Sequence, residues 1–457
     1  MKKCKRKERM FGAGLFSTVI LTVFFLCTIL CGAATAKADK VIKIGLIGPL
    51  TIANGEQELM SVKLAVEEIN EAGGVNVKGV KHKLVLVKAD SNEMSSIPDA
   101  VSAMERLITV DKVNFVIGGY RTEAVISQME VVADNKIVHI GGGGSPKLLA
   151  RVAKNYDRYK YYFMVIHLNT VNFLISTHYV LDSVANKVRA ALGIKKPKVA
   201  ILMDKVLIND PWVKHSKKVF PKMGLELTGV WRPNPFQTDF TAELSAMKSA
   251  GTHIVYSVFT GPSGVVFSKQ WGESKSPIMI SGYNTYGQVG RHWKDTHGMC
   301  NYEIVWNRPG RVKITEKTIP FYDKFFKRYG ETPGLFSGAY DGMYILKEGI
   351  ERAGTLESDA VVAAIEKTDY IGAAGRFVIT PMGSKSKSPS KLPHQATWGP
   401  GYVTEGCTQW RDGKQVPIWP DGNVPMGDER WKGLKYEGTK DIELSPRFLK
   451  YWKNKGK

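Results

Sequence analysis

A regular alternation of extended and helical patterns limits this chain to one kind of architecture. Residues 41–48 place isoleucine and leucine at alternate positions, as in a buried strand, and residues 55–70 carry apolar side chains at helical spacings. Gly73 and Gly74 then supply a left-handed helix end. The pattern repeats, with further strands expected at 84–87, 113–117 and 137–140 and helices at 100–108 and 125–133. Repeated strand–helix–strand units predict a doubly wound parallel sheet.

A second set of the same patterns follows the first. Strands are expected at 199–203, 225–230, 254–258 and 278–280, and later helices at 319–329, 339–352 and 360–367. The sequence therefore predicts an α/β fold of two doubly wound parallel-sheet lobes. A run rich in lysine and serine at 384–391 predicts an exposed basic loop, whose role the sequence leaves open.

The N-terminal residues have the layout of an export signal. Six basic residues lie between Lys2 and Arg9, an apolar run extends from Phe11 to Leu30, and small residues follow up to Ala38. This order is typical of a secretory signal peptide, predicted here as residues 1–36, and it places the mature protein in the periplasm. Two alternatives are a permanent membrane anchor and lipid attachment at Cys31. The residue before Cys31 is a leucine, where a lipid-attachment site usually has a small residue.

The composition limits the classes of partner that we expect for this protein. The chain has 64 lysines and arginines against 43 acidic residues, a formal net charge of +21. It has no compact arginine-rich cluster with interleaved aromatic residues, so we expect solvated lysine-rich faces and no nucleic acid partner. After the signal only Cys300 and Cys407 remain, and they either pair or stay as separate thiols. The scattered histidines show no metal-ligand spacing, so neither a metal nor a cofactor is expected.

The loops after three predicted strands of the first lobe are rich in glycine and hydroxyl groups. They are residues 48–51, 118–122 and 141–145, and in an open parallel sheet such loops carry the ligand site. Glycines allow close backbone approach, and a Ser or Thr at a helix start favours an anion. Thr122 and Ser145 are the best candidates, their alternative role being to cap the next helix. Nucleotide fingerprints are missing from the first of these loops.

Other polar residues near these strand ends have more than one interpretation. Arg121 either pairs with an acidic ligand or rims the site, and Tyr120 either covers an apolar ligand or packs on its own lobe. Asp204 and Glu303 resemble catalytic acids, but no base, nucleophile or oxyanion donor accompanies them in the sequence. No catalytic residue is therefore predicted.

Five segments resemble one known family. Residues 42–51, 65–74, 116–119, 238–241 and 339–342 are similar, in order, to the branched-chain amino acid binding proteins of ABC transporters, which are type I periplasmic binding proteins. The resemblance implies two lobes joined by three crossovers, near Val165, at 302–306 and at 375–377. It implies a first lobe of residues 41–165 plus 304–375, and a second lobe of residues 166–303 plus 376–457.

The resemblance also implies where a ligand is held and what the protein meets. Together with the loop analysis, it gives a predicted binding set of Tyr120, Arg121, Thr122, Gly144, Ser145, Asp210, Trp212, Phe259, Thr260, Tyr283 and Asn284. The expected partners are a small amino acid or carboxylic acid and the membrane permease subunits of an ABC importer, and the protein is expected to be a monomer.

One departure from the family bears on the ligand. Amino acid binders usually hold the α-amino group with an acidic residue where this chain has Tyr283 and Asn284. Burying an unpaired ammonium is costly, so either Asp210 takes that role or the ligand has no amino group. The sequence therefore predicts a non-enzymatic binding protein for an amino acid or a related organic or aromatic acid. A ligand-sensing receptor subunit and an enzyme on the same fold are the alternatives.

Overall fold

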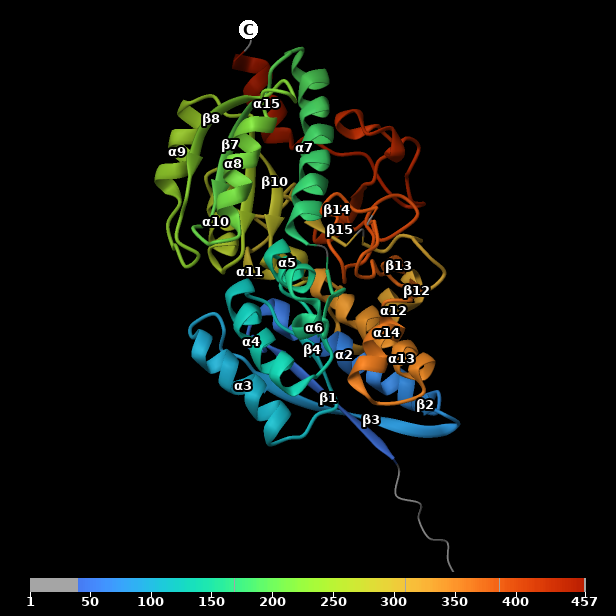
Figure 1. Ribbon diagram of the computed structural model, residues 1–457. Coiled ribbons are helices and arrows are strands. Elements are labelled where there is room, and N and C mark those ends of the chain that lie inside the picture. The colour runs from blue at the N-terminus through green and yellow to red at the C-terminus, as the bar shows by residue number, and fades with distance from the viewer. Residues whose placement is uncertain (1–39, 168, 309, 386, 456–457) are drawn as a thin grey trace, which may run out of the picture. The chain divides into compact units, whose positions relative to one another are not determined.

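The computed structural model describes residues 40–455 except 168, 309 and 386 (Figure 1). The predicted signal peptide and Cys31 lie outside the described residues. Within the described residues, no helix combines the length and the apolar character that a membrane crossing requires.

A six-stranded sheet forms the first lobe, with the strand order β2-β3-β1-β4-β5-β6. All neighbouring strands are parallel except the β2–β3 hairpin. The strands are β1 (Val41–Gly48), β2 (Val75–Val77), β3 (Val80–Asp90), β4 (Phe115–Gly118), β5 (His139–Gly141) and β6 (Tyr162–Met164). The four strands expected here are confirmed. β2 and β6 were not expected, because three-residue strands are too short to show an alternation of apolar and polar residues.

Helices cover this sheet and come from two distant parts of the chain. Those between the strands are α2 (Ala53–Glu71), α3 (Ile97–Thr109), α4 (Thr122–Asn135), α5 (Pro146–Lys154) and α6 (Tyr156–Tyr159). Those returning later are α12 (Thr318–Tyr329), α13 (Ala339–Ala353) and α14 (Ser358–Ile365). Figure 1 shows α13, in orange, beside α2, in blue, and the two helices are in contact. The three expected later helices are confirmed and complete the first lobe.

A seven-stranded sheet forms the second lobe, in the order β15-β14-β11-β10-β9-β7-β8. Its strands are β7 (Lys198–Met203), β8 (Glu226–Trp231), β9 (Ile254–Phe259), β10 (Met279–Asn284), β11 (Ile304–Asn307), β14 (Gly406–Arg411) and β15 (Lys414–Trp419). Its helices are α7 (Thr170–Leu192), α8 (Asn209–Val219), α9 (Thr241–Ser249), α10 (Ser263–Glu273), α11 (His292–Asp295) and α15 (Pro446–Lys455). The four strands expected from the sequence are again confirmed.

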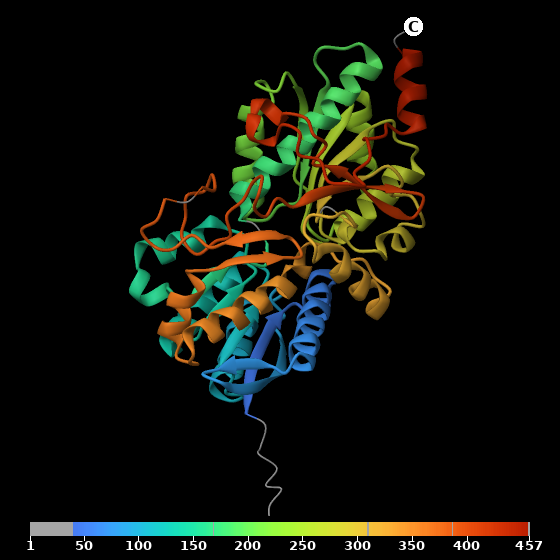
Figure 2. The ribbon, with the colours of Figure 1, turned by 90° about the vertical axis from the view of Figure 1, so that its right-hand side faces the viewer.

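An antiparallel hairpin extends the second sheet at its C-terminal edge. In Figure 2, β14 and β15, in red, lie beside the yellow strands, and β14 pairs with β11. The turn between them, Asp412 and Gly413, has positive φ at both residues, as a two-residue hairpin of the mirror-image type requires. The sequence analysis missed this hairpin, although an Asp-Gly pair between apolar runs is a hairpin signal.

One of the three crossovers differs from its expected position. The segment 302–306 was expected to leave the second lobe, but β11 pairs with β10 and belongs to the second sheet. The chain therefore returns to the first lobe only after Asn307. Near the third crossover, β13 (Gly375–Val378) pairs with β12 (Asp369–Gly372) in a separate two-stranded sheet. The lobe boundary at residue 304 is corrected accordingly, and the remaining lobe bounds stay a prediction.

The two cysteines of the predicted mature chain do not form a disulfide. Cys300 and Cys407 are both buried and unpaired, so the alternative of separate thiols holds in this structure. Cys300 packs with Trp410, and the Cys407 thiol donates to the carbonyl oxygen of Val305 at 3.1 Å.

In the run 384–391, the side chains of Lys385, Lys387 and Lys391 are exposed, whereas Ser388 is buried.

The central position of β1 gives a first prediction. Ile44 is fully buried between β3 and β4, whereas Val41, at the start of the same strand, is 44% exposed. We expect Ile44→Ala to lower the free energy of unfolding by about 2–5 kcal/mol because it leaves a cavity in the core. Val41→Ala should change it by less than about 0.5 kcal/mol. Urea denaturation of both variants measures the difference, and equal losses would contradict the assignment of this core.

Candidate functional site

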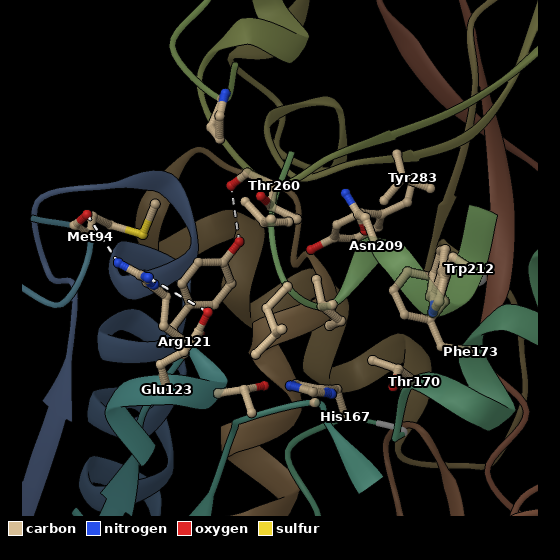
Figure 3. A pocket seen from close by; sticks show the side chains of 18 of the residues that line it. Met94, Arg121, Glu123, His167, Thr170, Phe173, Asn209, Trp212, Thr260 and Tyr283 are labelled. Carbon is tan, nitrogen blue, oxygen red and sulfur yellow. Dashed lines mark hydrogen bonds and ion pairs between the residues drawn. The ribbon is translucent and has the colours of Figure 1, made fainter. Parts of the chain in front are cut away.

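A cavity of about 380 Å³ lies where loops of the two sheets meet. Most of its walls come from the segments after β4, β5, β7, β8 and β9, from the end of β10 and from the start of α7, so most of the wall lies at or beyond the carboxyl end of a parallel strand (Figure 3). This is the expected place for a ligand in an open α/β sheet. The volume lies within the ~300–1,000 Å³ typical of small-molecule sites.

The first-lobe wall depends on glycines that let three loops pack closely. Gly118 and Gly119 have φ of 115° and 101°, a region that side chains rarely adopt. A Cβ on Gly118 would collide with the carbonyl oxygen of Ile47, and one on Gly142 would collide with that of Gly119. These contacts bring the first turn of α4, which begins at Thr122, to the cavity. The N–H groups of a first turn have no partner within their helix and favour an anion.

Glu93 holds the loop between β4 and α4 from behind. Its carboxylate accepts hydrogen bonds from the backbone N–H groups of Tyr120 and Arg121, at 3.3 and 2.7 Å, and from the Ser91 hydroxyl at 2.8 Å. Arg121 in turn donates to the carbonyl oxygens of Glu93 and Met94, at 2.9 and 3.3 Å. The Arg121 side chain is thus already held at the rim of the cavity.

Two buried carboxyls therefore lie under the first-lobe wall. Burial, and then the proximity of Glu93, raises the pKa of Glu58 well above its usual range, and burial raises the pKa of Glu93. Both oxygens of Glu58 lack a hydrogen-bond partner among the described residues. Burial without a partner favours the neutral form of the Glu58 carboxyl, because an unpaired buried charge is costly.

Aromatic rings form the inner wall. Phe173 packs edge-on against Trp212, with ring centroids 4.6 Å apart, and against Tyr283 at 4.9 Å, and it stacks on Trp306 at 3.7 Å. Figure 3 shows Phe173 and Trp212 side by side at one end of the cavity. Together with Phe336 they give the cavity a mainly apolar, ring-lined interior, which favours flat or branched apolar groups.

Tyr120 connects the two lobes across the cavity. Its hydroxyl donates to the carbonyl oxygen of Thr260 at 3.0 Å and lies 3.4 Å from the Thr285 hydroxyl, which donates to Tyr283. Burial raises the pKa of Tyr120 well above its usual range and that of Tyr283 to about 12, so both hydroxyls stay protonated. The rings and hydroxyls of Tyr120 and Tyr283 are therefore available as neutral contacts.

The structure places seven of the eleven predicted binding residues on the cavity wall. They are Tyr120, Arg121, Thr122, Gly144, Trp212, Thr260 and Tyr283. Whether these residues bind a ligand remains a prediction.

The other four do not line the cavity, each for a physical reason. Ser145 is the N-cap of α5, where its hydroxyl accepts from the Lys147 N–H at 3.3 Å. Asp210 has a side chain 65% exposed and pairs with Arg232 at 2.8 Å. Phe259 is buried in the core of the second lobe. Asn284 is buried behind the wall, where its amide donates to Glu303 at 2.9 Å.

Several wall residues were missed by the sequence analysis. They are Met94, Glu123, His167, Thr170, Phe173, Lys205, Val206, Leu207, Ile208, Pro235, Phe236, Val258, Leu335 and Phe336. Thr170 and Phe173 lie at the start of α7, which was not predicted because it is buried on several faces and shows no single apolar stripe. A usable signal was Asn169, whose side chain caps α7 by accepting from Val171 and Asn172.

One buried cluster has the chemistry of a metal site. His292, Cys300 and Glu303 each offer a ligand atom, all within 4.8 Å of one another. Their sequence spacing did not suggest this grouping. His292 Nε2 and Glu303 Oε2 lie 2.9 Å apart and already form a hydrogen bond, and Asn284 donates to the other oxygen of Glu303. The cluster lies outside the cavity, and its one internal hydrogen bond joins His292 to Glu303, whereas His292 Nδ1 has no hydrogen-bond partner among the described residues.

Comparison with known proteins gives a consistent result. A family model described as "Periplasmic binding protein" matches residues 41–387. The Leu/Ile/Val-binding protein homolog 7 of Brucella suis is 24% identical over 417 residues, covering 88% of this chain and 96% of that protein.

Solved structures show the same fold. A solute-binding protein of an ABC transporter from R. palustris, in complex with benzoate, superposes with a TM-score of 0.63 at 17% identity and covers 82% of this chain and 95% of that one. A branched-chain amino acid binding protein from Streptococcus pneumoniae, in complex with isoleucine, gives a TM-score of 0.63 at 19% identity, covering 82% and 98%. The two lobes described above therefore have the type I periplasmic binding protein fold.

The position of Ser145 gives a second prediction. Because its hydroxyl caps α5 and lies off the cavity wall, Ser145→Ala should lower the free energy of unfolding by about 0.5–2 kcal/mol. Urea denaturation of the ligand-free protein measures this loss. A variant as stable as the wild type would show that the side chain does not act as a cap.

Proposed function

We propose that this chain, which belongs to the periplasmic binding protein family, is the extracytoplasmic solute-binding protein of an ABC importer and binds a small carboxylate that lacks an α-amino group. The family consists of binding proteins and not of enzymes. The observation that supports this choice of ligand is a ring-lined cavity with a helix N-terminus on one wall and no uncommitted second-lobe carboxylate among the described wall residues.

The first turn of α4 is the proposed carboxylate site. Thr122 starts this helix and lines the cavity together with Gly144. Its hydroxyl and the free N–H groups of the turn are donors, and the helix dipole favours a negative charge there. Since Glu93 already accepts from the N–H groups of Tyr120 and Arg121, we assign the ligand carboxylate to the donors that begin at Thr122.

An ammonium group would have a poor partner in this cavity. The carboxylate of Asp210 forms an ion pair with Arg232, and the side-chain amide of Asn284 donates a hydrogen bond to Glu303. Glu123 does line the cavity, but it lies 3.7 Å from the guanidinium of Arg121 on the first-lobe rim, near the proposed carboxylate site. An α-amino group buried against the aromatic wall would therefore lose its hydration without gaining a counter-charge, at a cost of several kcal/mol.

The apolar wall favours an aromatic or otherwise planar acid. Phe173, Trp212 and Tyr283 present ring edges and faces at the end of the cavity away from Arg121 and Glu123 (Figure 3). A planar ring fits between such rings in stacked or edge-on geometry. Among the similar structures, one holds benzoate and another isoleucine, so both ligand classes occur on this fold. Benzoate is the probe that we choose for the aromatic class.

We propose the cellular location and the transport partners that are typical of the family. The protein is exported by a cleaved signal peptide, acts in the periplasm as a monomer and delivers its ligand to the permease subunits of the importer. Lipid attachment at Cys31 is the less favoured form of the same setting, because Leu30 precedes the cysteine. If N-terminal sequencing shows that the exported protein begins at Lys37 or Asp39, the signal peptide is cleaved as proposed. An acylated Cys31 at the N-terminus would instead show that the protein is anchored by a lipid.

The missing counter-charge gives a third prediction. Ligand-stripped protein, titrated by calorimetry, should bind benzoate more tightly than leucine by at least about 100-fold, the equivalent of ~2.7 kcal/mol. The physical reason is that removing the amine removes its desolvation cost. Leucine binding with micromolar affinity and no binding of benzoate would contradict the proposal and return this chain to the amino acid binders.

Thr122 and Ser145 provide a matched pair for a fourth prediction. Both are hydroxyl residues at helix starts of the first lobe, but only Thr122 lines the cavity. We expect Thr122→Ala to weaken benzoate binding by about 1–3 kcal/mol, because a hydrogen bond to a charged group is lost. Ser145→Ala should leave the dissociation constant unchanged. Equal effects of both substitutions on affinity would disprove the assignment of the carboxylate to the α4 terminus.

A further inference from the structure

Asp204 lies directly behind the second-lobe wall and is not part of it. It follows the last residue of β7 and is fully buried. Its side chain is the common acceptor for two wall segments. One oxygen accepts from the backbone N–H and the hydroxyl of Thr260, at 2.7 and 2.8 Å, and the other accepts from the Asn209 amide at 2.5 Å. A single carboxylate thus joins the loop after β9 to the start of α8.

The residue that Asp204 holds is also the residue that Tyr120 reaches. The N–H of Thr260 donates to Asp204, and the carbonyl oxygen of Thr260 accepts from the Tyr120 hydroxyl of the first lobe at 3.0 Å. The backbone of Thr260 is therefore fixed on both sides. Moving this loop by one hydrogen-bond length would break the link between the two walls of the cavity.

We propose that Asp204 is a positioning residue, whose unprotonated carboxylate fixes Thr260 and Asn209 so that the second-lobe wall can meet both Tyr120 and the ligand. This inference rests on the proposed function of the cavity. It goes beyond that function because it assigns a role in affinity to a residue that does not contact the ligand, and because it makes binding depend on pH.

The direction of the pH dependence follows from the hydrogen bonds. Burial raises the pKa of the Asp204 carboxyl to about 6, although the bonds from Thr260 and Asn209 favour its charged form. As the pH falls through 6, the carboxyl gains a proton, and its hydrogen bonds from Thr260 and Asn209 weaken because a neutral carboxyl is a poorer acceptor than a carboxylate. The affinity for the ligand should therefore be highest above pH 6 and decline below it. If only protein with unprotonated Asp204 binds the ligand, the affinity falls by about tenfold at one pH unit below the pKa.

The groups around Asp204 do not explain such a change. Tyr120 and Tyr283 face it and stay neutral because burial raises their pKa. Arg232 donates to the backbone carbonyl of Asp204 and pairs with the exposed Asp210. Lys205 is the next residue in the chain. His167 lines the cavity on the first-lobe side, and gaining a proton there would strengthen the binding of a carboxylate, the opposite direction.

The test compares Asp204→Asn with Asp341→Asn in the full-length mature protein. Asp341 is an equally buried carboxylate that accepts two backbone N–H groups, of Ala373 and Ala374, but it lies off the cavity. Calorimetric titration with benzoate from pH 7.5 to 5 should show wild-type and Asp341→Asn affinities that fall about tenfold. Asp204→Asn should bind at least about tenfold more weakly at pH 7.5 and show no such fall. Wild-type affinity in Asp204→Asn, or a flat wild-type profile, would overturn the proposal.

A second readout needs no ligand and separates this inference from the proposed function. In ligand-free protein at pH 7.5, hydrogen exchange measured by mass spectrometry should be faster in the segments 204–210 and 258–262 of Asp204→Asn than in those of Asp341→Asn. If benzoate fails to bind the wild type, the proposed ligand class is wrong, and faster exchange at these segments still supports the positioning role. Unchanged exchange in both segments would contradict it.

Discussion

The direction of the parallel strands is the constraint on which the site depends. Because β4 and β5 in one sheet and β7 and β9 in the other end toward the cavity, each sends its following loop to the same place, and β10 adds Tyr283 near its own end. The strands themselves are fixed by burial, since both faces of each sheet are covered and a slip of register would expose apolar side chains. Glycines then allow the loops to pack without side chains between them.

The electrostatics of the cavity differ from one wall to the other. The first-lobe wall presents a helix start above two carboxyls whose pKa values are raised by burial. The second-lobe wall presents aromatic rings, and the carboxylate of Asp204 behind this wall is occupied by hydrogen bonds from its own loops. A ligand with a negative end and an apolar end matches both walls, whereas a zwitterion leaves its positive end without a partner. This asymmetry is the basis of the ligand class that we propose.

The sequence predicted the parts of the fold that depend on local pattern. Strands such as 254–258 were found because β-branched residues form short continuous runs, and α13 was found because its apolar residues recur at helical spacing. The helix α7 was missed because it is buried on several faces, and the β14–β15 hairpin was missed because Lys414 and Pro417 mask the alternation of its second strand. The wall residue Phe173 was lost together with α7.

The sequence predicted the binding loops better than the direction of individual side chains. Thr122 and Ser145 look alike in sequence, since each is a hydroxyl residue after a glycine-rich strand end, yet only the first lines the cavity. Asn284 ends a strand that borders the cavity, but Glu303, nineteen residues along the chain, draws its amide away from the cavity. Such choices depend on partners that are distant in sequence, and local patterns do not contain them.

The central claim concerns the chemistry of the natural ligand. Protein purified without denaturation from its natural source, then denatured and analysed by mass spectrometry, should release an unmodified small carboxylic acid with no α-amino group. Release of leucine, isoleucine, valine or another α-amino acid in stoichiometric amount would contradict the account.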